Sequence, residues 1–260
     1  MSIIKRISIA AVTVVLVLTI LTFSSCVQST DNKSQNEKTP RFTSFKDIPG
    51  VTEDEITAIE ALQKKYASFV YGVTPSTEAF ANENGEIGGY AALLCEYLTE
   101  LFDIRFKPAF TEGKTDFTGE MKPTKERRKN LFMTKNPIAR RYPAIVRIEG
   151  SRAITQIEKE RILRYAFLKD SATIEDVASV LAPGSYEAVA IESGEFYQTL
   201  KNGGADGLVV VNTEQDAFDA YDDLVIQPFY PLVFLPVSLA AEKPELAPII
   251  SVMDKALKNG

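Results

Sequence analysis

The side chains available for chemistry in this chain are limited first by the absence of histidine. Among 260 residues there is no His, and there are two Cys, 29 Lys and Arg, and 35 Asp and Glu. This composition excludes Ser-His-Asp and Cys-His nucleophiles, imidazole bases, and His-ligated zinc or haem. An enzyme of this sequence would depend on carboxylates, Lys, Tyr or Cys. The absence of histidine removes no side chain that a binding protein requires.

One pair of cations stands where it could bind an anion. Arg127 and Arg128 follow Thr124, which is predicted to cap a basic helix over residues 125–131. A guanidinium binds a carboxylate through two parallel hydrogen bonds, and the free N–H groups at a helix start favour anions. Successive helical residues face about 100° apart, so both arginines cannot enter one cleft. Taken alone, the pair indicates a solvated basic face.

Residues 1–25 have the layout of a secretory signal. Lys5 and Arg6 precede an apolar run and two small serines, which lead to Cys26. The run is short for a membrane span. Phe-Ser-Ser-Cys resembles a bacterial lipobox, with Phe in place of the usual Leu, and this implies lipidation of Cys26. An uncleaved anchor helix is the alternative. Both place the rest of the chain outside the cytoplasm, tethered to a membrane.

The remaining composition describes an ordinary acidic globular protein. Residues 26–48 are polar and poor in apolar side chains, which predicts a flexible tether. The net charge is −6 without a basic stripe, so we expect no nucleic-acid binding. Cys95 lies in an apolar helical pattern and is expected to be a buried structural thiol. We expect a monomer without a cofactor or metal ion.

Strand-like and helix-like segments alternate from residue 52 onward. The first helix is expected to begin with a capping box formed by Thr52 and Glu55, and Thr173 is expected to cap a later helix. Asn82 to Gly85 has the composition of a tight turn. The alternation indicates an α/β fold with mainly parallel sheets. Strands are predicted over 67–72, 104–110, 116–120, 140–148, 163–168, 188–191, 206–211 and 232–239, and helices over 52–65, 88–102, 125–131, 173–181, 194–201, 214–221 and 244–257.

Several short motifs occur in order along the exported part of the chain. They are Asn-Gly-Glu-Ile-Gly-Gly-Tyr (84–90), Asp-Phe-Thr-Gly-Glu (116–120), Thr-Lys-Glu-Arg-Arg (124–128), Leu-Lys-Asn-Gly-Gly-Ala-Asp (200–206) and Lys-Pro-Glu-Leu-Ala-Pro-Ile-Ile (243–250). In this order and spacing, over about 69–257, the chain resembles family 3 of the extracellular solute-binding proteins.

The resemblance implies a two-lobed, periplasmic-binding-protein-like (type II) fold with a ligand cleft at the hinge. Lobe 1 would comprise 49–143 and 231–260, and lobe 2 would comprise 144–230. Two crossing strands would join the lobes, and closure on a small molecule would be a hinge motion in which ligand selects the closed state.

The resemblance also assigns binding roles in lobe 1. Arg127 aligns with the arginine that clamps the ligand α-carboxylate in amino-acid-binding members. Thr118, Gly119 and Glu120 would line the floor, with Glu120 as acceptor for a ligand amine or as partner in a surface salt bridge. The aromatic residues Phe80 and Tyr71 are expected either as walls of the cleft or as core residues.

In lobe 2, Ser171 and Thr173 stand where a helix N-terminus meets ligand oxygens in the family, although capping alone explains Thr173. Amino-acid-binding members commonly place a carboxylate for the ligand amine at the end of the strand after Asp206. Here that strand ends at Asn212, and Asn212 or Glu214 would have to substitute.

A second departure lies in the connection between the strands 105–110 and 116–120. It has only five residues, whereas a parallel crossover normally needs about ten or more, usually with a helix. Either the two strands connect irregularly, or this chain is a degenerate copy with a weakened first lobe.

The expected function is capture of a small polar, carboxylate-bearing, amino-acid-like ligand by a membrane-anchored extracytoplasmic protein. The ligand would serve ABC-type uptake or sensing, through a permease or a sensor partner. The alternatives are a non-binding copy and an enzyme such as a dehydratase, with Glu120 as acid–base group. Since there is no histidine, binding should show no histidine-type pH switch near neutrality.

Overall fold

The structure is a computed structural model, and it describes residues 42–110, 115–169, 171 and 173–260. The predicted signal segment, Cys26 and most of the predicted tether lie outside the described residues. The end of that tether is folded instead, because η1 (Phe45–Asp47) brings Phe45 and Ile48 into the core. Within the described stretches, no helix combines the length and the apolar character that crossing a bilayer requires.

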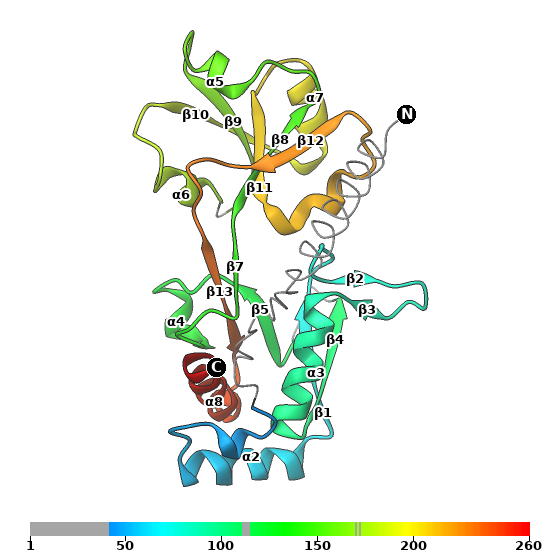
Figure 1. Cartoon of the computed structure of the whole chain (residues 1–260), viewed down its shortest axis with the longest axis vertical. Coiled ribbons are helices and arrows are strands. Elements are labelled where there is room, and N and C mark those ends of the chain that lie inside the picture. Colours follow the sequence, from blue (N-terminus) through cyan, green and yellow to red (C-terminus); the bar gives the residue numbers. More distant parts are fainter. Residues whose placement is uncertain (1–41, 111–114, 170, 172) are drawn as a thin grey trace, which may run out of the picture. The chain divides into compact units, whose positions relative to one another are not determined.

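The first sheet is built from both halves of the sequence (Figure 1). Its strand order is β4-β1-β5-β13-β6, and β7 pairs with β13. A single hydrophobic core joins this sheet to the helices α2 (Glu53–Lys65), α3 (Tyr90–Phe102) and α8 (Ala247–Asn259). The strands are β1 (Ser68–Val73), β4 (Arg105–Phe110), β5 (Phe117–Met121), β6 (Phe132–Met133), β7 (Ala139–Arg141) and β13 (Leu235–Ala241).

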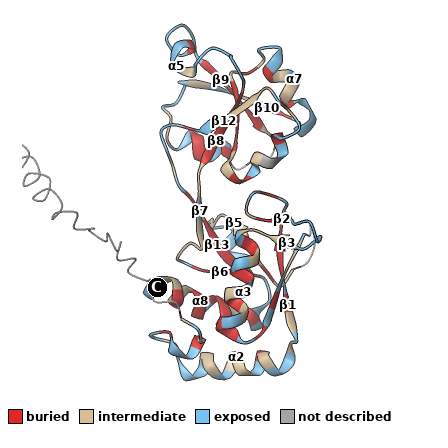
Figure 2. Cartoon of the chain, turned by 45° about the vertical axis from the view of Figure 1, so that its right-hand side comes forward, coloured by how far each residue is buried: buried red, intermediate tan, exposed pale blue. Residues whose placement is uncertain are grey.

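The second sheet has the order β10-β9-β11-β8-β12. One face packs on α7 (Phe196–Lys201) and η3 (Asn212–Phe218), and the other packs on α5 (Ile154–Ile157) and α6 (Thr173–Ala178). Figure 2 shows buried residues concentrated along the strands of both sheets. The strands are β8 (Pro143–Ile148), β9 (Leu163–Leu168), β10 (Tyr186–Ile191), β11 (Gly207–Val211) and β12 (Leu224–Pro228).

Each sheet has a parallel centre extended by antiparallel strands. β1 is parallel to β4 and β5, and β9 is parallel to β10 and β11, as the α/β alternation predicts. The strands that follow the two connections between the sheets, β8 and β13, run antiparallel to their neighbours. The expected parallel pairing is therefore found at the centre of each sheet. The chain crosses from the first sheet to the second before β8 and returns before β13, and each of these strands runs opposite to the parallel strands of the sheet that it enters.

The short connection after β4 is explained by the register of the strands. β4 and β5 lie on opposite sides of β1, and β4 ends opposite Val73 whereas β5 is paired at Tyr71 and Gly72. The chain must step back two residues along β1, from Val73 to Tyr71, which is roughly 7 Å, and cross β1, roughly another 10 Å. Six residues span up to about 20 Å. Six residues are therefore enough to connect the two strands, because β5 begins beside the end of β1.

Several local predictions are confirmed. Thr52 and Glu55 form the expected capping box at the start of α2, and Asn82 and Gly85 close the expected turn, between β2 (Phe80–Ala81) and β3 (Ile87–Gly88). Cys95 is buried on α3, and burial raises its pKa to about 12, as expected of a structural thiol.

Other local predictions are wrong. The basic helix is a single turn, α4 (Arg127–Asn130), although the Thr124 hydroxyl accepts from the Arg127 N–H as predicted. Thr173 is the first residue of α6 and not its cap, because the Ser171 hydroxyl accepts from the Thr173 N–H. Strand β12 (Leu224–Pro228) was not predicted. Only three apolar residues stand between the preceding Asp-Asp and the terminal Gln-Pro, which is too short a run to indicate a strand.

Glu55 predicts a specific dependence of stability on pH. Burial raises the pKa of its carboxyl, but hydrogen bonds from Lys255, the Thr52 N–H and Ser251 outweigh burial and lower the pKa to about 2. Because the folded-state pKa is lowered, this stabilisation is present above about pH 4.5 and is lost as the pH falls toward 2. After allowance for solvent screening we expect about 1–2 kcal/mol.

The variant Glu55→Gln should therefore show a flatter loss of unfolding free energy between pH 4.5 and 2, measured by urea titration at each pH. Glu53→Gln, at an exposed position in the first turn of the same helix, is the control. Equal acid sensitivity in wild type and in Glu55→Gln would contradict the assignment.

Candidate functional site

A cavity of about 240 Å³ is lined by side chains from both sheets. It lies at the carboxyl ends of β5 and β11, where parallel α/β sheets characteristically bind ligands. Charged groups of both signs dominate its wall. The lining residues are Glu120, Lys122, Arg127, Arg141, Leu235, Pro236 and Val237 on the side of the first sheet, and Ser171, Thr173, Asp176, Val211 and Glu214 on the side of the second.

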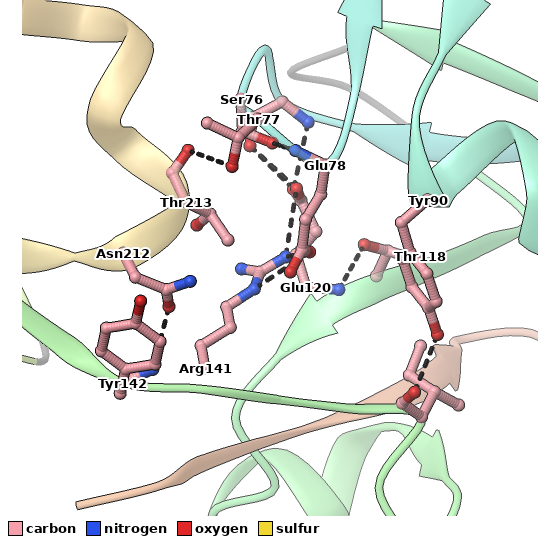
Figure 3. A network of polar contacts seen from close by, with 12 residues as sticks. Ser76, Thr77, Glu78, Tyr90, Thr118, Glu120, Arg141, Tyr142, Asn212 and Thr213 are labelled. Atoms are coloured by element: carbon pink, nitrogen blue, oxygen red, sulfur yellow. Dashed lines mark hydrogen bonds and ion pairs between the residues drawn. The ribbon is translucent and has the colours of Figure 1, made fainter. Parts of the chain in front are cut away.

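Arg141, at the end of β7, organises one wall of the cavity (Figure 3). Its Nε and Nη2 atoms donate to Glu78 Oε2 at 3.2 and 2.7 Å, and its Nη2 atom lies 3.9 Å from Glu120 Oε1. The Arg141 side chain is 14% exposed. Two carboxylates from separate loops and strands are thus held next to one buried guanidinium, which fixes the shape and charge of this wall.

Glu120 is held from a second direction by Thr74. The Thr74 N–H donates to Glu120 Oε2 at 3.1 Å, and its hydroxyl lies 3.0 and 2.9 Å from the two carboxylate oxygens. The carboxylate therefore takes part in an internal network and is not a salt bridge on the outer surface. It faces the cavity with its position fixed by β1 and β5.

The two adjacent arginines have different surroundings. Arg127 is exposed, lines the cavity, and donates from Nη1 to the carbonyl of Lys122 at 3.2 Å. Arg128 donates to the carbonyls of Met133 and Thr134 at 3.2 and 3.1 Å and does not line the cavity. In the described part of the chain, no carboxylate forms an ion pair with Arg127. Its charge remains available to a ligand anion.

Two contacts join the halves of the cavity. Lys122, after β5, forms an ion pair with Asp176 on α6, whose side chain is only 9% exposed. The Thr77 N–H donates to the carbonyl of Thr213 at 3.1 Å. Each contact joins a residue beside the first sheet to one beside the second, and the Lys122–Asp176 pair lines the cavity itself.

The charges that line the cavity are nearly balanced. Lys122 is paired with Asp176, and Arg141 is paired with Glu78 behind the wall. Arg127 on the side of the first sheet and Glu214 on the side of the second have no ion-pair partner among the described residues, and Glu120 lines the cavity beside Arg141. Burial raises the pKa of the Glu214 carboxyl. A ligand with one carboxylate and one amine matches this arrangement, because each of its charges meets the opposite sign.

The floor residues predicted beside Glu120 lie as follows. Thr118 accepts from the Glu120 N–H at 3.4 Å and lines a neighbouring cavity of about 330 Å³ instead. A Cβ atom at Gly119 would lie 1.8 Å from the Tyr71 hydroxyl oxygen, so only glycine fits. Tyr71 is 2% exposed and belongs to the core, which was one of its two expected roles. Burial raises its pKa well above the usual range.

Phe80 is 45% exposed on the β2–β3 hairpin and contacts Gly88. It is not part of the cavity lining, so its role as an aromatic wall has no support in this geometry. Ser171 and Thr173 do line the cavity, with their hydroxyl oxygens 2.8 Å apart. Asn212 accepts from the Tyr142 N–H through its side-chain oxygen at 2.9 Å and so holds the connection between β7 and β8.

Sequence reasoning missed Arg141, Lys122 and Asp176. Arg141 stood inside a segment predicted only as extended, and its sole signal was the Arg-Arg pair at the start of that segment. Lys122 follows the Asp-Phe-Thr-Gly-Glu motif directly and could have been found by its position. In the described residues, no three metal-binding side chains of the His, Cys, Asp and Glu types cluster in a way that could hold an ion.

No protein-family model and no curated protein sequence matches this chain. Solved structures do. An arginine-bound form of ArgBP from T. maritima is 18% identical and aligns over 77% of this chain and 98% of its own, with a TM-score of 0.54. The BvgS periplasmic domain from B. pertussis is 18% identical over 81% of this chain and 43% of its own, with a TM-score of 0.60.

A third match is an ancestral amino-acid-binding protein described as a precursor of cyclohexadienyl dehydratase. It is 16% identical over 77% of this chain and 92% of its own, with a TM-score of 0.52. The chain has the two-lobed, type II fold of periplasmic binding proteins. At these identities the likeness is one of fold.

Proposed function

We propose that the cavity between the two sheets binds a small, amino-acid-like ligand that bears a carboxylate. The observation that carries this proposal is Arg127, which lines the cavity together with Glu120 and Glu214 and has no carboxylate partner among the described residues. The fold supports it, since solved relatives of this fold are described as bound to arginine or glutamine. Together these favour recognition of a zwitterion over recognition of a neutral solute.

In this proposal Arg127 clamps the ligand carboxylate, and Glu120 or Glu214 accepts from the ligand amine. Ser171 and Thr173 supply hydroxyls to ligand oxygens, and Thr118 and Gly119 shape the floor. Asn212 contributes by holding the connection between the sheets. Tyr71 acts through the packing behind the site, and Phe80 has no role in it.

The lobes are proposed as 49–143 plus 231–260 and 144–230. The protein would be a monomer outside the cytoplasm, held at a membrane through lipidated Cys26, and its partner would be an uptake permease or a sensor module. The match to the BvgS periplasmic domain supports a location outside the cytoplasm.

Two alternatives remain open for the same cavity. An enzyme such as a dehydratase would use Glu120 as its acid–base group, and the match to a dehydratase precursor motivates this reading. A non-binding copy would keep the fold without affinity. The geometry favours binding, because both carboxylate oxygens of Glu120 are engaged by Thr74 and the carboxylate lies beside Arg141, so its position is held by the protein.

A thermal-shift screen of the full chain with amino acids, small carboxylates and short peptides tests the proposal, followed by mass spectrometry of any compound that raises the melting temperature. We expect at least one amino-acid-like compound to stabilise the protein and to be recovered unchanged. Conversion of the compound would indicate the enzyme, and no stabilisation by any compound would indicate the non-binding copy.

A further inference from the structure

A cavity of about 1000 Å³ lies outside the proposed binding cleft. It opens on the face of the second sheet that carries Ile145, Leu163 and Tyr165, and it extends to Leu181 and Phe229. Only two short helices, α5 and α6, cover this face. They are too short to fill the space over five strands, which leaves an apolar hollow beside α5.

Among the charged residues that line this hollow, Arg147 is the buried one. Arg147 points to the same face of β8 as Ile145, and it is 8% exposed. Its Nη2 atom donates to Ser151 Oγ at 2.9 Å and to the carbonyl of Arg152. Its Nε atom is shielded from solvent and has no acceptor. Arg147 is therefore buried with its Nε–H donor lacking a hydrogen-bond acceptor.

Arg147 also lacks a counter-charge. No carboxylate in the described part of the chain forms an ion pair with it, and the neighbouring Glu160 and Asp206 are already paired with Arg152 and Arg161. Four exposed charged residues also line the cavity, namely Glu158, Lys159, Glu160 and Arg161. A buried cation without a partner is costly, and an anion that enters the cavity would offset that cost.

We propose that this cavity is a second ligand site, for an amphiphilic monoanion such as a medium-chain carboxylate. The carboxylate interacts with the Arg147 guanidinium, and the alkyl body lies against the apolar wall formed by Ile145, Ile154 and Phe229. A volume of about 1000 Å³ is at the upper end of the range of small-molecule sites. A single buried cation favours one negative charge over two.

Decanoate is the probe that tests the proposal, with decylamine and 1-decanol as matched compounds of the same chain length. We expect saturable binding of decanoate to the full chain by isothermal titration, with the amine and the alcohol clearly weaker. Arg147→Met keeps the length of the side chain and removes the charge. It should weaken decanoate binding by roughly tenfold or more, the effect of losing a hydrogen bond to a charged group.

Lys159→Met removes one exposed cation from the same cavity, and Arg127→Ala removes one from the cleft; both should bind decanoate as the wild type does. Circular dichroism will show whether Arg147→Met folds. If it does not, Ile154→Glu is measured in its place, because it puts a carboxylate on α5 at the cavity and should abolish decanoate binding. Absence of saturable binding, equal affinity for decylamine, or unchanged affinity in a folded Arg147→Met or Ile154→Glu would overturn the proposal. None of these outcomes bears on amino-acid binding in the cleft.

Discussion

The Arg127→Ala variant is expected to lose the thermal stabilisation that an amino-acid ligand gives to the wild type. Arg127 lines the cavity and has no carboxylate partner in the described residues. Removing one member of a charge-assisted ligand contact typically costs 2 kcal/mol or more, which is a factor of roughly 30 in Kd. Since Arg127 is exposed, its removal should change the stability of the unliganded protein by less than about 0.5 kcal/mol.

Arg128→Ala is the matched control for this prediction. This variant removes the same charge one residue later. In the wild type the Arg128 guanidinium donates to the carbonyls of Met133 and Thr134. We expect a lower melting temperature without ligand and an unchanged Kd. Equal Kd values for Arg127→Ala and wild type, or a weakened Kd in Arg128→Ala alone, would remove Arg127 from the site.

The Gly119→Ala variant is expected to be strongly destabilised. An added Cβ would lie 1.8 Å from the Tyr71 hydroxyl oxygen and 2.6 Å from Ile138 Cδ1. Tyr71 is fixed in the core, so the clash must move the backbone of β5 or the tyrosine itself. We expect a loss of about 2–3 kcal/mol in the free energy of unfolding by urea titration.

Two further variants make the Gly119 prediction specific. Gly194→Ala adds the same methyl group where no atom lies within 4 Å, and it should change stability little. Tyr71→Phe combined with Gly119→Ala removes the clashing oxygen and should recover part of the loss. An undisturbed Gly119→Ala protein would show that β5 can shift freely, which would also weaken the account of a fixed Glu120.

The order of the elements and much of the local structure could be predicted from the sequence. The capping box of Thr52 and Glu55, the helix after Gly89 and the buried strand after Asp206 depend on residues close together in the chain. Local propensity and hydrophobic period report such features directly. The two-lobed fold followed from the order of motifs, which carries information beyond any single segment.

The site was only partly predictable, because its contacts join distant parts of the chain. Arg127 could be selected by its position in a motif, but the pairing of Arg141 with Glu78 spans 63 residues and that of Lys122 with Asp176 spans 54. Such ion pairs depend on how the strands cross between the sheets. The same limit explains why the short connection after β4 looked like a defect until the register with β1 was known.

Recognition of a ligand carboxylate by Arg127 can be measured by isothermal titration of the full chain with the amino acid that stabilises it best, compared with its decarboxylated amine and with its carboxamide. We expect measurable binding of the amino acid and affinity at least about tenfold weaker for both analogues. Equal affinity for the amine or the carboxamide would contradict this recognition.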